Sequence, residues 1–250
     1  MEGLPVRRFA GRPPAIVALH GFTQHGGMFA ELAAITGREI LAPDLPGHGG
    51  AAAFPATFPA AIAAVAAVTG GRALLGYSQG GRIALGVALE HPQAVSHLIL
   101  ISTGIGIADE RRRLVRQTRD EALARVIESE DLESFFERWM NRPIFDGLHR
   151  RGAAWLEADV ALRLENTARG IAGALRGMGQ GAQPWYGDRL EELEMPVLVI
   201  AGERDPRYVA IAERVAAATG GRLVVVEDAG HAVVGEAPRK VALEIERFLG

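Results

Sequence analysis

Short apolar runs recur along the chain, and each ends in small or polar residues. The runs are continuous rather than alternating, which is typical of strands that are buried on both faces of a parallel sheet. Helical patterns follow the third and fifth runs, at 81–90 and 208–219, so strands and helices alternate. The order predicts an α/β fold with a mostly parallel, doubly wound sheet. The predicted strands are 15–19, 39–42, 72–75, 97–101, 197–201 and 223–226.

The alternation stops once, between residues 104 and 188, where only helical patterns are found. Such an insertion predicts an all-helical lid over the strand ends, where α/β folds bind ligands. We therefore expect a core of 1–103 and 189–250 with a lid of 104–188. An amphipathic stripe within the lid is expected to pack it onto the core. Its members, at i, i+3, i+4, i+7 and i+8, are Leu132, Phe135, Phe136, Trp139 and Met140.

Composition narrows the class of protein. The 250 residues are 48% hydrophobic, and 27 basic side chains face 30 acidic ones, a formal net charge of −3. This balance predicts no attraction to nucleic acid or to an anionic membrane. Cysteine is absent, which excludes disulfides and thiolate catalysis. The opening stretch Met1–Arg8 has no long apolar run, and 59–68 is too short to span a bilayer, so we expect a cytoplasmic protein without membrane insertion.

A candidate nucleophile follows the third predicted strand. The segment Gly76-Tyr77-Ser78-Gln79-Gly80 has the pattern G-x-S-x-G, between a strand and a helix. A sharp turn from strand to helix strains the serine backbone and leaves no room for side chains two residues before and after it. The N-terminus of the following helix also favours negative charge. We therefore predict that Ser78 is a catalytic serine at the top of the sheet.

The expected partners of a catalytic serine come later in the chain, first an acid and then a histidine, each after a strand. Asp205 follows the fifth predicted strand and His231 follows the sixth. His231 would accept the proton of the Ser78 hydroxyl, while Asp205 would hold the imidazole tautomer and stabilise the imidazolium. Glu203 is an alternative to Asp205 if the loop turns differently. Asp228 is too close in sequence to reach around His231.

An oxyanion hole needs two backbone N–H groups near the serine. We expect one from Gln79, directly after Ser78, and one from Phe22, in the loop after the first predicted strand. Arg82 lies four residues after Ser78 on the same helix face, and a guanidinium there suits a carboxylate-rich substrate. An ion pair between Arg82 and a lid acid such as Glu165 is the alternative.

Three further patterns predict no site. Gly104–Asp109 imitates a dinucleotide-binding loop, but an acid replaces the third small residue. Arg111–Arg113 has acidic neighbours and is interpreted as a solvated helix face. Five histidines share no spacing with carboxylates that would indicate a metal site, and we expect neither a metal nor another cofactor. They are His25, His48, His91, His97 and His149.

These residues resemble the α/β-hydrolase superfamily. Ser78, Asp205 and His231 stand where that superfamily has its catalytic triad. The pair His20-Gly21 and the segment Asp44–Gly49 are similar to its other motifs. One difference is that the opening strands of the superfamily look abbreviated, because few residues precede the first predicted strand.

From about residue 15 onward the chain more closely resembles one family, 2-succinyl-6-hydroxy-2,4-cyclohexadiene-1-carboxylate (SHCHC) synthase, a lyase of menaquinone biosynthesis. The resemblance implies that the serine, made basic by its partners, abstracts a proton from the substrate ring, after which pyruvate leaves by elimination. It implies no acyl-enzyme. The motifs that carry it are Gly76–Arg82, Trp139 followed by Pro143–Phe145, Arg163, Leu175–Gly181 and Gln183-Pro184.

The same resemblance implies a small-molecule carboxylate as the substrate. Arg82, Tyr77, Trp139 and Arg163 are its expected contacts. Met140 is a departure, because some members of the family carry a tyrosine there. The alternative function is a serine hydrolase of the same fold, acting on esters or on carbon–carbon bonds, in which the serine is a covalent nucleophile.

Overall fold

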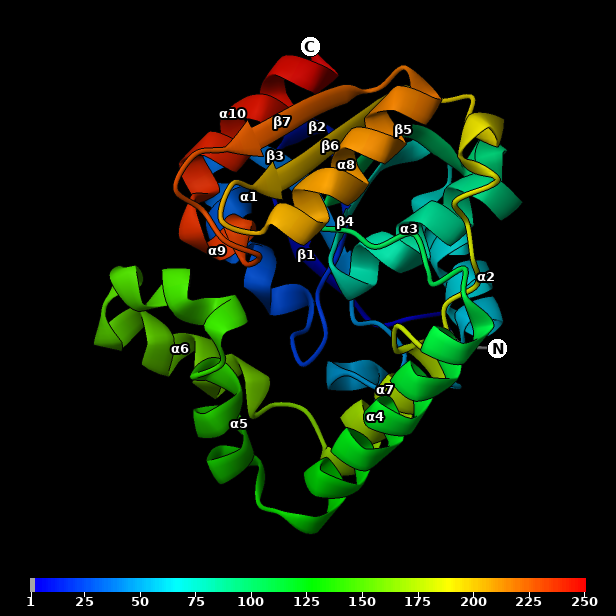
Figure 1. Cartoon of the computed structure of the whole chain (residues 1–250). Helices are drawn as coiled ribbons and strands as arrows, with labels where there is room; N and C mark the ends of the chain where they lie inside the picture. Colours follow the sequence, from blue (N-terminus) through cyan, green and yellow to red (C-terminus); the bar gives the residue numbers. More distant parts are fainter. Residues whose placement is uncertain (1–2) are drawn as a thin grey trace.

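The chain folds around one seven-stranded sheet (Figure 1). The computed structural model describes residues 3–250, so Met1 and Glu2, which begin the stretch Met1–Arg8, lie outside it. The strand order is β1-β3-β2-β4-β5-β6-β7, and every neighbouring pair is parallel except β1 with β3. The predicted α/β fold with a mostly parallel sheet is confirmed. The strands are β1 Val6–Phe9, β2 Arg12–Leu19, β3 Arg38–Pro43, β4 Arg72–Tyr77, β5 Val95–Ile101, β6 Val197–Gly202 and β7 Arg222–Val226.

Helices cover both faces of the sheet and make three layers. Leu98 and Leu100 of β5 pack on one face with α2, α3 and α8, whereas Ile99 and Ile101 pack on the other with α1, α9 and α10. Successive side chains of β5 thus point to opposite faces, and both faces are buried, which explains the continuous apolar runs. These helices are α1 Ala30–Thr36, α2 Phe58–Thr69, α3 Gln79–Glu90, α8 Pro206–Thr219, α9 Val233–Glu236 and α10 Pro238–Leu249.

The sheet has one strand more than the sequence predicts. Strand β1 lies at the edge, and its residues alternate between exposed and half-buried positions. Two of its four residues are Arg7 and Arg8, so no apolar run marks it. Strand β2 also begins earlier than expected, at Arg12, because Arg12 already pairs with Arg38 of β3.

Residues 102–196, between β5 and β6, contain helices and loops and no strand. Most helices of this segment lie at one end of the core, with α4 beside α7 (Figure 1). They are α4 Glu110–Ser129, α5 Leu132–Met140, the 3-10 helix η4 Pro143–Arg151, α6 Ala153–Arg163 and α7 Ala168–Met178. The 3-10 helix η5 Leu190–Glu192 instead contacts α8 of the core. The other 3-10 helices are η1 Gly26–Phe29, η2 Gly49–Ala51 and η3 Pro92–Ala94.

The apolar stripe of α5 packs mainly within this helical segment. Phe135 and Phe136 are buried in a cluster with residues of α4 and α7, among them Ile171. Met140 belongs to a different cluster, which includes Ala232 of the core. The expectation that the stripe joins the segment to the core was therefore wrong for Phe135 and Phe136, because α4 and α7 present apolar faces of their own.

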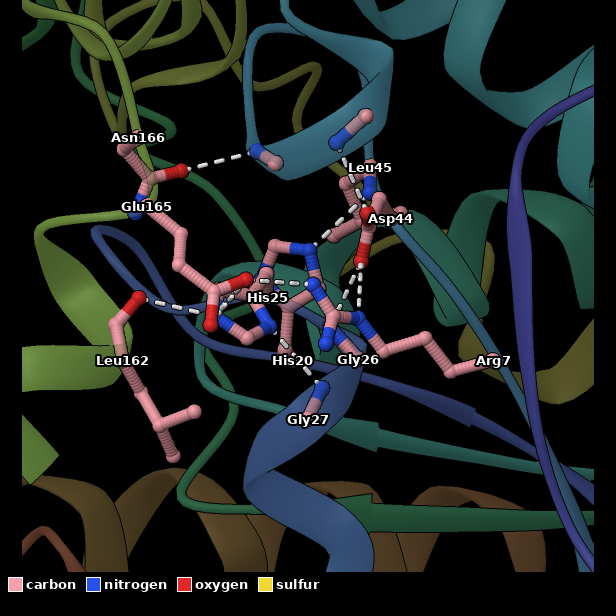
Figure 2. Close-up of polar contacts among 12 residues, drawn as sticks. Arg7, His20, His25, Gly26, Gly27, Asp44, Leu45, Leu162, Glu165 and Asn166 are labelled. Carbon is pink, nitrogen blue, oxygen red and sulfur yellow. Dashed lines mark hydrogen bonds and ion pairs between the residues drawn. The ribbon is translucent and has the colours of Figure 1, made fainter. Parts of the chain in front are cut away.

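Polar contacts fasten the end of α6 to the core (Figure 2). Arg7 of β1 donates a hydrogen bond of 2.7 Å to the Glu165 carboxylate, and His25 Nε2 donates one of 2.8 Å to the Leu162 carbonyl. The Asn166 side-chain oxygen accepts a hydrogen bond of 2.8 Å from the first N–H of η2. The helical segment is thus tied to β1, to the loop after β2 and to the loop after β3.

Candidate active site

Ser78 lies in the turn between β4 and α3. Its φ of 51° is a left-handed value, which is strained for a residue with a side chain. A Cβ on Gly76 would lie 2.5 Å from the Gly81 Cα, and a Cβ on Gly80 would lie 2.3 Å from the Leu19 carbonyl oxygen. These close approaches explain why the turn has glycine on both sides of the serine.

Three side chains from distant parts of the chain form a hydrogen-bonded row. The Ser78 hydroxyl lies 3.0 Å from His231 Nε2, and His231 Nδ1 donates a hydrogen bond of 2.7 Å to Asp205 Oδ2. Because Asp205 holds the proton on Nδ1, Nε2 is left to accept from the serine. Glu203 instead accepts a hydrogen bond of 3.0 Å from the N–H of Asp228. The structure therefore brings Asp205, and not Glu203, to the histidine.

The structure places the two residues of the predicted oxyanion hole beside Ser78, in the lining of one cavity. The N–H groups of Phe22 and Gln79 have no hydrogen-bond acceptor within residues 3–250. Both residues line the same cavity as Ser78. They are thus available to a developing negative charge beside the serine.

Two buried neutral histidines hold the loop that carries Phe22. His20 Nε2 accepts a hydrogen bond of 2.9 Å from the Leu45 N–H, and His48 Nε2 accepts one of 3.3 Å from the Thr23 N–H. Burial lowers the pKa of His20 and of His48 to about 3. Both rings are therefore neutral near pH 7, which their role as acceptors requires.

A cavity of about 630 Å³ opens at Ser78 between the core and the helical segment. Its walls hold six arginines but only one carboxylate, that of Asp120, although the whole chain has a net charge of −3. We call it the basic cavity. All four expected substrate contacts line it, namely Tyr77, Arg82, Trp139 and Arg163, together with four arginines that sequence reasoning did not assign to a site, Arg116, Arg119, Arg142 and Arg207.

Arg82 is a buried cation without a counter-ion. Arg82 is only 6% exposed, and its Nη1 donates a hydrogen bond of 3.1 Å to the Met178 carbonyl. No carboxylate oxygen of residues 3–250 lies within 4.0 Å of it. The alternative pairing with Glu165 is not formed, because Glu165 binds Arg7. Burial lowers the pKa of Arg82 to about 10, so the guanidinium stays charged near pH 7.

The other expected contacts have different surroundings. Arg163 is also buried, but its Nε donates a hydrogen bond of 2.7 Å to Asp159 and its Nη1 contacts the Thr23 hydroxyl. The indole N–H of Trp139 is buried and has no acceptor in the described part of the chain. Burial raises the pKa of Tyr77, so its phenol stays protonated. Tyr77 thus keeps its phenol proton and the covered indole N–H of Trp139 has no acceptor, whereas Arg163 has a paired charge.

The arginines of α4 show what sequence reasoning missed. Arg116, Arg119, Asp120 and Leu123 all line the basic cavity, and their spacing of three and four residues puts them on one face of α4. Arg116 Nε donates a hydrogen bond of 2.7 Å to Asp120. The spacing is visible in the sequence, but only the packing of α4 decides that this face meets the cavity. Arg111–Arg113, interpreted as a solvated face, are exposed or half-buried.

Within residues 3–250, no group of three or more His, Asp or Glu side chains is arranged to hold a metal ion. In the same range, no helix has the length and apolar character needed to cross a membrane.

Comparisons with known proteins agree with this geometry. Residues 16–244 match the alpha/beta hydrolase family. The "Putative 2-succinyl-6-hydroxy-2,4-cyclohexadiene-1-carboxylate synthase" of Bacillus subtilis (strain 168) is 38% identical over 70% of this chain and 65% of its own length. The synthase of that name from Salmonella paratyphi C (strain RKS4594) is 31% identical over 98% of each chain. The solved structure of MenH from S. aureus is 27% identical, with a TM-score of 0.91 over 98% of this chain and 97% of that one. The chain therefore belongs to the alpha/beta hydrolase family and, within it, to the family of the SHCHC synthases.

Proposed function

We propose that the protein is a lyase that eliminates pyruvate from a succinyl-cyclohexene polycarboxylate to give SHCHC. Its relatives carry the name of that synthase. The observation that carries the proposal is Arg82, a buried guanidinium without a carboxylate partner in a cavity rich in arginine. A neutral ester would leave this charge unpaired, whereas a polycarboxylate would pair it through charge-assisted hydrogen bonds.

In this proposal Ser78 is the base that starts the elimination. His231 Nε2 takes the hydroxyl proton, and Asp205 stabilises the imidazolium through the 2.7 Å hydrogen bond. Ser78 Oγ then takes a proton from the ring carbon beside the succinyl carbonyl. The C–H electron pair forms a ring double bond, and the C–O bond to the leaving group breaks. The expelled enolate takes the proton from His231 and becomes pyruvate, which restores the starting state.

The free N–H groups of Phe22 and Gln79 would stabilise the charge that develops on the succinyl carbonyl oxygen. Mutational studies of such donors give about 10²- to 10³-fold in rate, and a positioned base gives about 10²- to 10⁴-fold. The chemistry is proton transfer and C–O cleavage only, so it calls for no metal and no redox cofactor.

The substrate contacts follow from the state of each side chain. Arg82 would bind a substrate carboxylate, the protonated Tyr77 phenol would donate to another substrate oxygen, and Trp139 would pack against the substrate. Arg163 would orient the substrate without adding net charge, because Asp159 already balances it. We propose that 104–188 is a lid on the core of 1–103 and 189–250, and that the enzyme meets this small dissolved acid in the cytoplasm.

A direct assay tests the proposal. The purified protein is incubated with the succinyl-cyclohexene polycarboxylate that carries an enolpyruvyl ether, and pyruvate is measured with lactate dehydrogenase. We expect one pyruvate for each substrate consumed, and none with Ser78→Ala. Failure to release pyruvate, together with rapid turnover of simple esters, would favour a serine hydrolase and overturn the proposal.

A further inference from the structure

The loop that carries His231 is held by a buried carboxylate five residues further on. Glu236 is the last residue of α9, and its side chain is 2% exposed. Its Oε2 accepts a hydrogen bond of 2.7 Å from the Gly230 N–H, and its Oε1 accepts one of 3.1 Å from the Ala232 N–H. Gly230 and Ala232 are the residues directly before and after His231, so the two carboxylate oxygens bind the backbone on both sides of the imidazole.

A helix of the inserted segment reaches the same loop. Arg150 of η4 lies 3.6 Å from Glu236 Oε2 and donates hydrogen bonds of 2.9 Å to the Asp228 carboxylate and 2.6 Å to the Asp228 carbonyl. Asp228 has a left-handed φ of 63°, three residues before His231. At Gly147 of η4, an added Cβ would lie 1.8 Å from Glu236 Oε2, so η4 packs directly against this carboxylate.

We propose that Glu236 is a positioning residue for catalysis, which fixes His231 between Ser78 and Asp205 while Arg150 balances its charge. The proposal rests on the proposed role of His231 as the proton acceptor. His231 must keep hydrogen bonds of 3.0 Å and 2.7 Å in opposite directions, and a loop alone does not hold a side chain that closely. Glu236 lines a neighbouring cavity that shares His231 with the basic cavity, but both of its carboxylate oxygens bind the backbone N–H groups beside His231, so we place its action on His231.

The chemistry of the two hydrogen bonds calls for a carboxylate. Glutamine at position 236 would offer one oxygen, and its NH₂ group would face a backbone N–H, so one flanking amide of His231 would lose its acceptor. The loop that carries His231 would then lose one of its two hydrogen bonds to residue 236, and the imidazole could shift away from Ser78. A displacement of about 1 Å in a catalytic group lowers turnover by about 10²-fold.

The test compares Glu236→Gln with the wild-type chain in two assays. One assay gives kcat and KM for pyruvate release, and the other gives the rate at which a fluorophosphonate labels Ser78. We expect kcat and the labelling rate to fall by about 10- to 100-fold, with KM changed by less than about threefold. Val65→Ala, a buried change in α2 on the opposite face of the sheet from α9 and α10, is the control for lost stability and should keep the wild-type labelling rate.

Every outcome decides the matter. A folded Glu236→Gln protein that labels within about twofold of wild type overturns the proposal, as does an equal fall in Val65→Ala. If Glu236→Gln does not fold, Arg150→Gln replaces it, because the Arg150 side chain is 46% exposed and its loss should not prevent folding. An unchanged rate of Ser78 labelling in Arg150→Gln also overturns the proposal. Labelling that falls in the variant while wild type releases no pyruvate supports the positioning role and rejects the lyase. A wild-type chain that is not labelled at all rejects both.

Discussion

Replacing Arg82 with methionine should raise stability while it removes function. Burial lowers the pKa of Arg82 from 12.5 to about 10, and this difference corresponds to about 3 kcal/mol of unfavourable free energy for the charged group near pH 7. Methionine is also long and unbranched, so it fills much of the same space without a charge. The Met178 carbonyl keeps the hydrogen bond of 3.2 Å from Gln79 Nε2. We expect the free energy of unfolding to rise by about 1 to 3 kcal/mol.

The same substitution should weaken carboxylate substrates selectively. A substrate carboxylate that relieves the unpaired charge gains about 3 kcal/mol from it, which corresponds to about a hundredfold loss of kcat/KM in Arg82→Met. A neutral p-nitrophenyl ester makes no such contact, and its kcat/KM should change by less than about threefold.

Urea denaturation at pH 7 and parallel kinetics with the two substrates measure both effects. Arg163→Met is the matched control, because it leaves the buried Asp159 without its partner and should lower the free energy of unfolding by about 3 kcal/mol. If Arg82→Met is destabilised as much as Arg163→Met, or if both substrates lose equally, the account of Arg82 as an unpaired, substrate-seeking cation is wrong.

Three further predictions follow from the local geometry. Ser78→Ala should lower the rate of pyruvate release by more than about 10³-fold and change the free energy of unfolding by less than about 1 kcal/mol; retained turnover would reject Ser78 as the base. Burial lowers the pKa values of His20 and His48 from 6.5 in the unfolded chain to about 3 in the folded chain. Below pH 6.5 the unfolded chain therefore binds more protons than the folded chain, and the free energy of unfolding decreases as the pH is lowered. Urea titrations should show a loss of about 2 to 3 kcal/mol for the pair between pH 7 and pH 5.5, and a flat profile would contradict the neutral assignment. Gly80→Ala should lower the melting temperature, because its Cβ would lie 2.3 Å from a backbone carbonyl of β2. Gly173→Ala has no atom within 4 Å of its Cβ and should stabilise α7 by about 0.5 to 1 kcal/mol. The opposite order of stabilities would show that the turn tolerates a side chain.

The central sheet and the order of Ser78, Asp205 and His231 could be predicted because each depends on a local signal. A strand buried on both faces must be apolar at every buried position, and β6 satisfies this over its whole length, as do β4 from Ala73 and β5 from Leu98 onward. The turn at Ser78 needs small residues at fixed spacings, which the chain shows directly. Strand β1 lacks both signals, since it is half-exposed at the sheet edge, and it was missed.

The parts that sequence reasoning missed depend on how helices pack. Arg116 and Arg207 are ordinary charged positions until α4 and α8 are placed beside Ser78. Glu236 likewise has no signal of burial in the sequence, and its role is visible only from the amides of Gly230 and Ala232. The roles of Arg116, Arg207 and Glu236 depend on residues that are distant in the sequence, so the neighbouring residues in the sequence do not indicate these roles.

The central claim is that Ser78 acts as a base and never forms a bond to the substrate. Rapid-quench mass spectrometry of the chain during turnover of the enolpyruvyl substrate tests it, with pyruvate measured in the same samples. The account predicts that pyruvate accumulates while the mass of the chain stays unchanged at every time point. An adduct on Ser78 that forms and decays at the rate of turnover would contradict it.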